Sequence, residues 1–519
     1  MSRDKFILYT FLDFMNRRIK MQKMTEVVKI RRKVLAEIAM LTFAGELNKN
    51  RIGDMFDHVV TEDGPRYRCC VYKERAILKD RVKFAMAQPL ESGMAKAITD
   101  ALDGKIANMP IINIMPEACD QCPIDKFFVT NACRNCVAHH CIASCPKKAI
   151  HVVHNQAYID KLSCVECGLC KKSCMYGAIV EINRPCEQAC DLGAIKADKA
   201  RRAVIDYDKC VECGGCKVAC PFGAITEQSY LVQIIQEIKA GKRVYAMLAP
   251  AFVSQFGAKV KPGQVVSALK EAGFYDVWEA SFGADIVTLE EAKEFAQSVP
   301  DKHSFMTTSC CPSFVSLIKK QLPDFVEHIS TTVSPMVATG KVIKELDKEA
   351  VVVFIGPCLA KKAEARQYAE VIDFVASFEE IASLLVGAGV NIAESTESNF
   401  ITSASQRGNS FAKAGGVVQA VIDSAAKNHP DLIIKPHRGE GLLVCKTALQ
   451  QIAAGKIDAN FFEGMACNGG CVGGPGVLSD VRVSTKMVEN LASSSTMIAA
   501  PDNEKAIDVS KKQLHWHSK

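Results

Sequence analysis

The sequence lacks an apolar run of the roughly 18 to 20 residues that a membrane-crossing helix needs. Its opening segment holds only a short apolar stretch that Asp13 interrupts, and no small-residue cleavage site follows that stretch. We therefore predict a cytoplasmic protein that does not cross a membrane.

The sequence also lacks a long basic run and any nucleic-acid-binding signature. Its 64 basic and 58 acidic residues are interspersed, so the formal charge of +6 does not indicate a nucleic-acid partner. No glycine-rich dinucleotide fingerprint follows a strand, and no flavin fingerprint is present, which argues against NAD as a direct partner. Apolar residues make up 48% and charged residues 24%, and these ordinary values exclude a disordered or fibrous chain.

Cysteine is abundant, but its distribution is not that of a disulfide scaffold. The 24 cysteines are fewer, for a chain of this length, than a short secreted disulfide scaffold would have, and they are concentrated in a few tight runs. In a reducing cytoplasm, metal ligation is the first interpretation of cysteines that lie two or three residues apart.

Composition divides the chain into four predicted regions. Residues 1–110 are predicted to be a helical leader, and residues 111–230 hold sixteen cysteines within an internal repeat of short apolar pairs. Residues 240–490 alternate strand-like and helical stretches, which predicts an α/β domain, and residues 491–519 form a polar tail. The fold class is therefore a multi-domain α+β protein.

Local periodicity predicts individual elements. The leader should contain a helix over residues 26–47 with one apolar face, made of Val27, Ile30, Val34, Ile38 and Leu41. Further helices are expected over 263–274 and 288–299. Strands are expected at VYAMLAP (244–250), VVVFIGP (351–357) and FITSAS (400–405).

Three cysteine runs have the spacing of bacterial ferredoxins, Cys-x2-Cys-x2-Cys-x3-Cys, in which three thiolates hold one 4Fe-4S cluster and the fourth ligates its partner. The run from Cys210 to Cys220 matches completely, and the run from Cys164 to Cys174 lacks only the closing proline. The run from Cys133 to Cys145 is longer by two residues. Structural zinc is the alternative, but zinc sites do not use this run repeatedly.

The sixteen cysteines divide into four predicted 4Fe-4S clusters if an inner unit of about residues 123–183 is inserted into an outer one. The inner unit would hold two clusters, on Cys133, Cys136, Cys141 and Cys174, and on Cys145, Cys164, Cys167 and Cys170. The outer unit would hold two more, on Cys119, Cys122, Cys186 and Cys220, and on Cys190, Cys210, Cys213 and Cys216. His139 and His140 could replace a thiolate, but solvent-facing loop positions are the ordinary interpretation.

Three separated segments carry further chemistry: TSCCP (308–312), GPCLAKKAE (356–364) and EGMACNGGCVGG (463–474). In residues and in order they resemble the three active-site signatures of the iron-only ([FeFe]) hydrogenases, over about residues 240–480. The resemblance is to the ferredoxin-linked monomeric type with four accessory clusters. It implies a two-lobed α/β catalytic domain that interconverts H2 with protons and electrons, ferredoxin or flavodoxin as electron partner, and maturation proteins that build the cofactor.

That cofactor is the H-cluster, a 4Fe-4S cubane bridged to a two-iron subcluster with CO, cyanide and dithiolate ligands. The resemblance implies that Cys471 also bridges to the two-iron subcluster, that Lys361 binds one cyanide, and that main-chain N–H groups near Pro250 and Ala251 bind the other. Met336 and Met465 would line the cavity. The implied cubane ligands are Cys311, Cys358, Cys467 and Cys471.

A proton relay is implied as well, because heterolytic cleavage of H2 needs a base near the iron. Cys310 resembles the first proton acceptor, and Glu291, Ser330 and Glu294 resemble the next stations. The spacing of Glu291 and Glu294 places them one helical turn apart on one face. Glu364 follows Cys358 at the family's interval, with a surface salt-bridge partner as the alternative.

Some residues depart from the commoner family pattern or fall outside it. Phe314, Gly356, Ala251 and Pro475 stand where the family more often has Trp, Met, Ser and Gly, which puts in doubt the cavity shape and the second hydrogen bond to cyanide. The remaining cysteines, Cys69, Cys70 and Cys445, match no ligand pattern and are predicted to be small buried core residues.

Two non-enzymatic functions compete with the hydrogenase. A hydrogen sensor usually lacks the relay cysteine and carries a signalling domain, whereas Cys310 is present here and no such domain is visible. An iron-sulfur assembly factor would not need the complete third motif with Cys471. A plain electron carrier would not require residues 240–480 at all.

Overall fold

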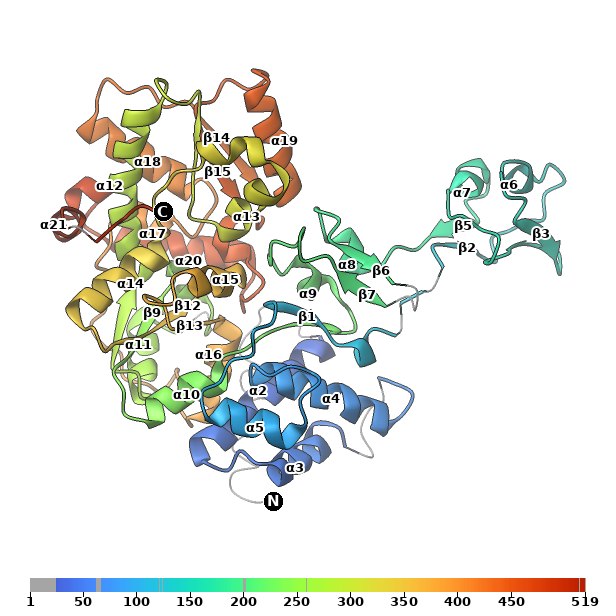
Figure 1. The fold of residues 1–519 in the computed structure, drawn as a ribbon, viewed down its shortest axis with the longest axis horizontal. Helices are drawn as coiled ribbons and strands as arrows, with labels where there is room; N and C mark the ends of the chain where they lie inside the picture. Colours follow the sequence, from blue (N-terminus) through green and yellow to red (C-terminus); the bar gives the residue numbers. More distant parts are fainter. Residues whose placement is uncertain are drawn as a thin grey trace.

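The computed structural model describes residues 25–61, 67–120, 122–123, 125–198, 202–257, 259–512 and 514–518. Figure 1 shows a set of N-terminal helices, a cysteine-rich region that extends to one side, and a larger body of mixed helices and sheets. No helix within these ranges combines the length and the apolar character that a membrane crossing requires. The opening segment with Asp13 lies outside the described residues.

The N-terminal helices confirm the predicted helical leader over its described part. They are α2 (Glu26–Ala44), α3 (Lys49–Val59), α4 (Val71–Ala85) and α5 (Met94–Leu102). The hydroxyl of Thr25 caps α2 by accepting from Val28 N, and Gly45 ends it with a left-handed φ of 72°. Helix α2 packs on α16 (Phe378–Gly387), where a Cβ added to Gly387 would lie 2.5 Å from that of Ala39. Only a glycine permits so close an approach.

Two nested units with the same strand pairing make up the cysteine-rich region. In the outer unit, β1 (Ile112–Ile114) pairs with β8 (Ile225–Glu227), and β6 (Ile195–Ala197) pairs with β7 (Ala203–Ile205). In the inner unit, β2 (Phe127–Val129) pairs with β5 (Ile179–Glu181), and β3 (Ile150–Val153) pairs with β4 (Gln156–Ile159). Short helices complete the units: η1 (Pro116–Ala118), α6 (His140–Ala143), α7 (Leu169–Ser173), α8 (Pro185–Gln188) and α9 (Gly215–Ala219).

The inner unit, residues 125–183, is called the inner lobe. Its buried residues form a separate core that includes Phe127, Ile150, Ile159 and Ile179. Figure 1 shows the inner lobe projecting from the rest of the molecule, with β2 and β5 at its near end and β3 at its far end.

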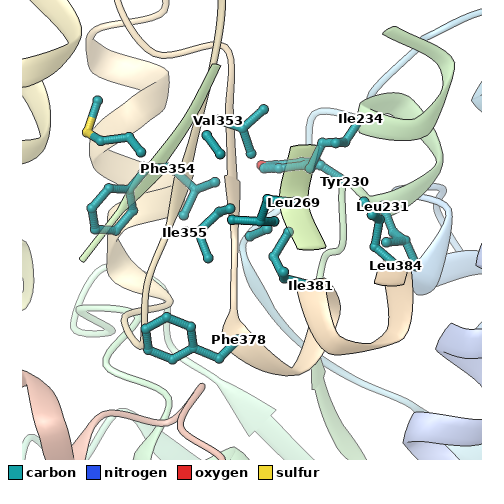
Figure 2. Packing of buried hydrophobic residues seen from close by; sticks show 14 of the residues in the cluster. Tyr230, Leu231, Ile234, Leu269, Val353, Phe354, Ile355, Phe378, Ile381 and Leu384 are labelled. Atoms are coloured by element: carbon teal, nitrogen blue, oxygen red, sulfur yellow. The ribbon is translucent and has the colours of Figure 1, made fainter. Parts of the chain in front are cut away.

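The body contains two parallel sheets. One has the strand order β10 (Asp276–Glu279), β9 (Val244–Leu248), β12 (Val351–Ile355) and β13 (Phe374–Ala376); the other has β11 (Met306–Thr307), β15 (Phe461–Met465) and β14 (Pro436–Glu440). Every residue of β9 and β12 is buried, as parallel strands covered on both faces require. Figure 2 shows Val353, Phe354 and Ile355 of β12 in a cluster with Leu384 and Phe378 of α16.

Helices cover these sheets and confirm two of the predicted ones, α11 (Pro262–Glu271) and α12 (Ala280–Ser298). The others are α10 (Leu231–Lys239), η2 (Pro250–Ser254), α13 (Pro312–Gln321), η3 (Pro323–His328), α14 (Pro335–Leu346), α15 (Ala360–Gln367), α17 (Gln406–Ser410), α18 (Gly416–Asn428), α19 (Leu442–Ala453) and η4 (Gly470–Gly473). The C-terminal segment, of which residues 491–519 were expected to form only a polar tail, contains α20 (Val481–Ser494), η5 (Ala500–Asp502) and α21 (Glu504–Ser510).

The strand predicted at residues 400–405 is wrong, because the segment is irregular. The hydroxyls of Thr402 and Ser403 each donate to the buried carboxylate of Glu279 at 2.8 Å. The hydroxyl of Ser405 caps α17 by accepting from Gly408 N at 3.0 Å. Local side-chain hydrogen bonds thus replace a strand ladder.

Candidate metal centre and proton path

A cavity of about 70 Å³ lies where strands of both sheets end. Pro250 follows β9, Cys310 follows β11, Cys358 follows β12, and Met465 ends β15; all four line the cavity. Met336, at the start of α14, lines it too, whereas Ala251 is buried on η2 and does not reach the wall. Carboxyl ends of parallel strands are where α/β sheets ordinarily bind ligands.

The structure brings together the four thiols predicted to hold the cubane. Cys311, Cys358 and Cys471 line the cavity. Burial raises the pKa of Cys467 well above its usual range, and the neighbouring thiols Cys358, Cys311 and Cys471 raise it further. Burial and Cys311 likewise raise the pKa of Cys471 to about 12. Four neighbouring thiols that oppose one another's ionisation fit a cationic iron cluster, which would bind all four as thiolates.

Lys361 supplies a positive charge at the cavity wall. Its Nζ donates to Cys310 O at 3.2 Å and to Glu364 Oε2 at 2.6 Å. Burial lowers the pKa of Lys361, but the attraction of Glu364 outweighs burial and leaves that pKa above its ordinary value. An ammonium in an otherwise largely apolar wall suits an anionic ligand, as the cyanide assignment requires. The alternative that Glu364 is a surface salt-bridge partner is wrong, because its carboxylate is buried beside Lys361.

The predicted relay residues are adjacent to one another. Burial and Glu291 raise the pKa of Cys310 well above its usual range. Glu291 is fully buried on α12, its two carboxyl oxygens have no hydrogen-bond partner among the described residues, and burial followed by Glu294 raises its pKa to about 8. One turn later, Glu294 accepts from Ser330 Oγ at 2.7 Å. A buried carboxyl that stays protonated near neutral pH can both give and take a proton.

The path reaches the surface through residues that the sequence did not identify. Thr331 Oγ1 donates to Glu294 Oε1 at 2.7 Å and lies 2.8 Å from His517 Nδ1. Glu294, Thr331 and His517 line an open pocket of about 370 Å³. The hydroxyl triplet from Ser330 to Thr332 could have suggested a polar path, but no sequence signal connects it with His517 near the end of the chain.

Thiols of the nested units lie close enough to raise one another's pKa values. Burial is the first cause in each case and the neighbouring thiols add to it: Cys220, Cys122 and Cys119 act on Cys186, whose pKa is about 12; Cys213, Cys210, Cys190 and Cys186 act on Cys216; Cys164, Cys167 and Cys145 act on Cys170; and Cys174 and Cys136 act on Cys141. Because Cys186 belongs to a different predicted cluster from Cys216, these neighbours do not separate the two outer clusters, and the division into four clusters stays a prediction. Cys133 packs on the core of the inner lobe together with thiols of both predicted inner clusters.

The internal repeat has a structural explanation. A main-chain N–H four residues after a cysteine donates to its sulfur, from Ala149 to Cys145 at 3.3 Å, and likewise from Ala194 to Cys190 and from Ala224 to Cys220. Such hydrogen bonds stabilise a thiolate.

One thiol group adjoins the four-thiol cavity. Cys190, Cys210, Cys213 and Cys216 line a cavity of about 280 Å³ together with Cys467, and Cys213 contributes to the raised pKa of Cys467. We call this the proximal group. The group of Cys133, Cys136, Cys141 and Cys174 lies in the inner lobe and is called the distal group.

The expectation for the unassigned cysteines is only partly met. Cys445 is fully buried, as predicted. Cys69 is exposed and Cys70 is partly exposed at the start of α4, so the prediction of burial is wrong for both. Small size allows a cysteine to be buried but does not determine whether the surrounding fold covers it.

Part of the body is similar to known proteins. Residues 242–475 match the family described as "Iron only hydrogenase large subunit, C-terminal domain", and residues 203–226 match "4Fe-4S binding domain". The chain is 27% identical over 334 residues to the periplasmic [Fe] hydrogenase large subunit of Nitratidesulfovibrio vulgaris, covering 53% of this chain and 79% of that one. It is 28% identical over 303 residues to iron hydrogenase 1 of Clostridium pasteurianum, covering 48% of this chain and 53% of that one.

A protein with a different name also matches. Cytosolic iron-sulfur assembly component 3 of Rattus norvegicus is 24% identical over 311 residues, covering 49% of this chain and 65% of that one. Among solved structures, an apo [FeFe]-hydrogenase from Chlamydomonas reinhardtii gives a TM-score of 0.47 at 20% identity, covering 54% of this chain and 94% of that one.

Proposed function

Because this chain is an iron-only hydrogenase-like protein, we propose that it catalyses the reversible reaction 2 H⁺ + 2 e⁻ ⇌ H2. The observation that supports catalysis best is the series of neighbouring proton-carrying groups, from Cys310 beside the four-thiol cavity through Glu291 to Glu294 and a surface pocket. A protein that only carries electrons or clusters has no use for such a path.

The cavity thiols Cys311, Cys358, Cys467 and Cys471 would hold the H-cluster, with Cys471 also holding its two-iron part, and the cluster would supply the site where the H–H bond is made or broken. Other side chains of the cavity wall would bind the cluster's ligands and exclude water. Lys361 holds an anionic ligand, while Met336 and Met465 exclude water from the cavity.

Protons move along the chain's side chains. In the direction of H2 formation, Glu294 takes a proton from the surface pocket and Ser330 passes it to Glu291, which reprotonates Cys310 beside the reacting centre. A general acid works best when its pKa lies near the working pH, and the pKa of about 8 at Glu291 meets that condition.

Electrons would travel through four 4Fe-4S clusters held by the sixteen thiols. We expect electrons to move from the distal group to the proximal group because of their positions. The distal group lies in the projecting inner lobe, and the proximal group adjoins Cys467. We assign a small carrier protein, ferredoxin or flavodoxin, as the electron partner, a cytoplasmic location, and dependence on maturation proteins for assembly of the H-cluster.

Infrared spectroscopy of the matured protein tests this function. We expect CO and cyanide stretching bands together with H2 evolution from reduced viologen. Bands without turnover would favour a hydrogen sensor, and absence of the bands after maturation would favour an iron-sulfur assembly factor, a function suggested by the match to the rat protein.

A further inference from the structure

Two cysteines outside every predicted cluster lie side by side on the surface, directly before α4. Cys69 is exposed and Cys70 is partly exposed. Their sulfurs are 3.7 Å apart, and the Cys69 thiol donates to Cys70 Sγ. A cysteine without a ligand is ordinarily buried, so two exposed ones in contact are unusual. Accessible thiols with a second thiol beside them are typical of redox-active cysteine sites.

Cys70 has the surroundings of an attacking thiol. It is the N-cap residue of α4, a helix of 15 residues. The main-chain N–H of Lys73 lowers the pKa of Cys70, and the Cys69 thiol and the main-chain N–H of Tyr72 lower it further. A lowered pKa increases the fraction of thiolate, the form that attacks a disulfide. Cys69 is then placed to resolve the product, because its sulfur lies next to that of Cys70.

Hydrogen bonds hold the chain just before the two thiols against α4. The carboxylate of Glu74, a buried residue in the first turn of that helix, accepts from Tyr67 N at 2.7 Å and from Arg68 N at 3.1 Å. The two thiols therefore follow a fixed segment, and their contact is prepared by the fold.

Arg68 links this segment to the main chain of a predicted cluster site. Its side chain is only 7% exposed, and it donates to Asp120 Oδ1 and to Phe222 O, each at 3.1 Å. Asp120 directly follows Cys119, and Phe222 lies two residues after Cys220. Cys119 and Cys220 are predicted ligands of the same cluster. A movement of Arg68 would therefore be felt on two sides of that cluster site.

We propose that Cys69 and Cys70 form a reversible thiol–disulfide site for low-molecular-weight disulfides, and that Arg68 transmits its oxidation to the main chain around Cys119 and Cys220. The inference goes beyond the H2 reaction and does not depend on it. The Cys70 thiolate attacks one sulfur of RS–SR, which forms a mixed disulfide and releases RS⁻. The Cys69 thiolate then attacks Cys70 Sγ and releases the second RS⁻.

The exchange balances without another oxidant. The two protons of the cysteine thiols pass to the two RS⁻ ions, so two cysteine thiols and one RS–SR give one Cys69–Cys70 disulfide and two RSH. Two electrons leave the cysteine sulfurs and reduce the small disulfide. Exposed disulfides are readily reduced, so excess RSH should reverse the reaction.

Closing this disulfide has to move the main chain. The two sulfurs must approach from 3.7 Å to about 2.0 Å. Adjacent Cα atoms are about 3.8 Å apart, closer than the usual separation in a disulfide, so the peptide between Cys69 and Cys70 must rotate. Arg68 directly precedes this peptide, and the rotation should weaken its contacts with Asp120 and Phe222.

The first test treats the cluster-loaded protein with glutathione disulfide under argon. Trypsin cleaves after Arg68 and Lys73, so peptide 69–73 carries both cysteines and no other. We expect this peptide to lose two hydrogen atoms as two glutathione thiols are released, and to regain them in excess reduced glutathione, with iron and sulfide content unchanged.

Serine variants separate the two roles. Cys70→Ser should lower the rate of glutathione release roughly tenfold or more, whereas Cys69→Ser should release one glutathione and stop at a mixed disulfide on Cys70. An unmodified peptide in the wild type would overturn the thiol–disulfide site, as would a mixed disulfide that persists there.

Hydrogen exchange tests the part played by Arg68. On oxidation, amides of residues 116–120 and 220–224 should exchange roughly threefold faster or more, while those of the inner lobe stay unchanged. In Arg68→Ala the same amides should exchange faster before oxidation, and oxidation should add nothing. Arg51→Ala, which removes an exposed ion pair with Glu46, is the control and should behave as the wild type. Unchanged exchange in the oxidised wild type would overturn transmission through Arg68. Neither readout needs H2 turnover, so failure of the proposed function is distinguishable from failure of this inference.

Discussion

The four-thiol cavity and the inner lobe differ in how uniformly their thiols are enclosed, since the lobe contains both the buried Cys170 and the exposed Cys167. In the body, burial is the first cause that raises the pKa values of Cys358 and Cys467, and the cavity wall is largely apolar. In the lobe, Cys167 is exposed and Val137 beside the distal group is almost wholly so. Under the proposed function, proton transfer at the cavity needs a site from which bulk water is excluded. Electron transfer to the inner lobe instead needs a surface that a partner protein can contact.

The two regions also differ in how they are joined to the molecule. The N-terminal helices and the body share one hydrophobic core, whereas the inner lobe has a separate one. A substitution in one core should therefore leave the stability of the other core unchanged, and this independence can be tested.

The largest effect is expected for Cys310→Ala, which removes the proton acceptor from the buried cavity but no predicted metal ligand. Turnover should fall roughly 10² to 10⁴-fold, the usual contribution of a positioned acid or base, while the infrared bands persist. Cys445→Ala is the control, because it removes a buried thiol outside the cavity and should retain turnover. If Cys310→Ala kept wild-type turnover, the proton path would not begin at this residue.

Glu291 should make the stability of the body depend on pH in a direction opposite to that of an ion-paired carboxylate. Its pKa is about 8 in the folded protein against an ordinary 4.5, so between these values the native state keeps a proton that the unfolded chain has released. Stability should therefore fall as pH rises from about 4.5 to 8, by up to about 5 kcal/mol.

The variant Glu291→Gln should flatten this dependence, as measured by thermal unfolding at a series of pH values. Glu397→Gln is the control, because Glu397 is an exposed carboxylate paired with Lys261 and is not among the groups that raise the pKa of Glu291. A slope that stayed the same in Glu291→Gln would show that this carboxyl is ionised in the native state.

A third prediction concerns the shared core. Glu379 accepts from Arg31 Nε at 2.7 Å and from Arg32 Nε at 3.1 Å, and both arginines are on α2. Burial raises the pKa of Glu379, but Arg31 and Lys217 outweigh burial and hold that pKa far below its ordinary range. Glu379→Ala leaves these cations without their partner and should lower the free energy of unfolding by about 3 kcal/mol.

Hydrogen exchange locates this loss. Amides of α2 and α16 should lose protection, while amides of the inner lobe should not, because the lobe has its own core. Glu397→Ala, which removes an exposed ion pair with Lys261, should cost less than about 1 kcal/mol. Equal loss of protection in the lobe would show that the two cores unfold as one.

The two regions differ as well in how far the sequence predicts them. The thiol groups follow from local spacing, because three cysteines within seven residues must converge on one site whatever surrounds them. The relay depends on Glu291, Ser330 and Cys310, which come from separate segments, so only the family resemblance indicated it. The exposure of Cys69 and the irregular course of residues 400–405 depend on distant partners, which no local pattern encodes.

The smallest effect is expected at the outer end of the proton path. His517 Nδ1 lies 2.8 Å from Thr331 Oγ1, and its other nitrogen lies 3.7 Å from Glu290. The pocket of about 370 Å³ at this point is open, so water can replace the imidazole as the next proton carrier. We expect His517→Ala to lower viologen-driven turnover less than about threefold, well below the loss for Cys310→Ala. A hundredfold loss would instead show that proton transfer depends on His517 at the surface as strictly as on Cys310 in the cavity.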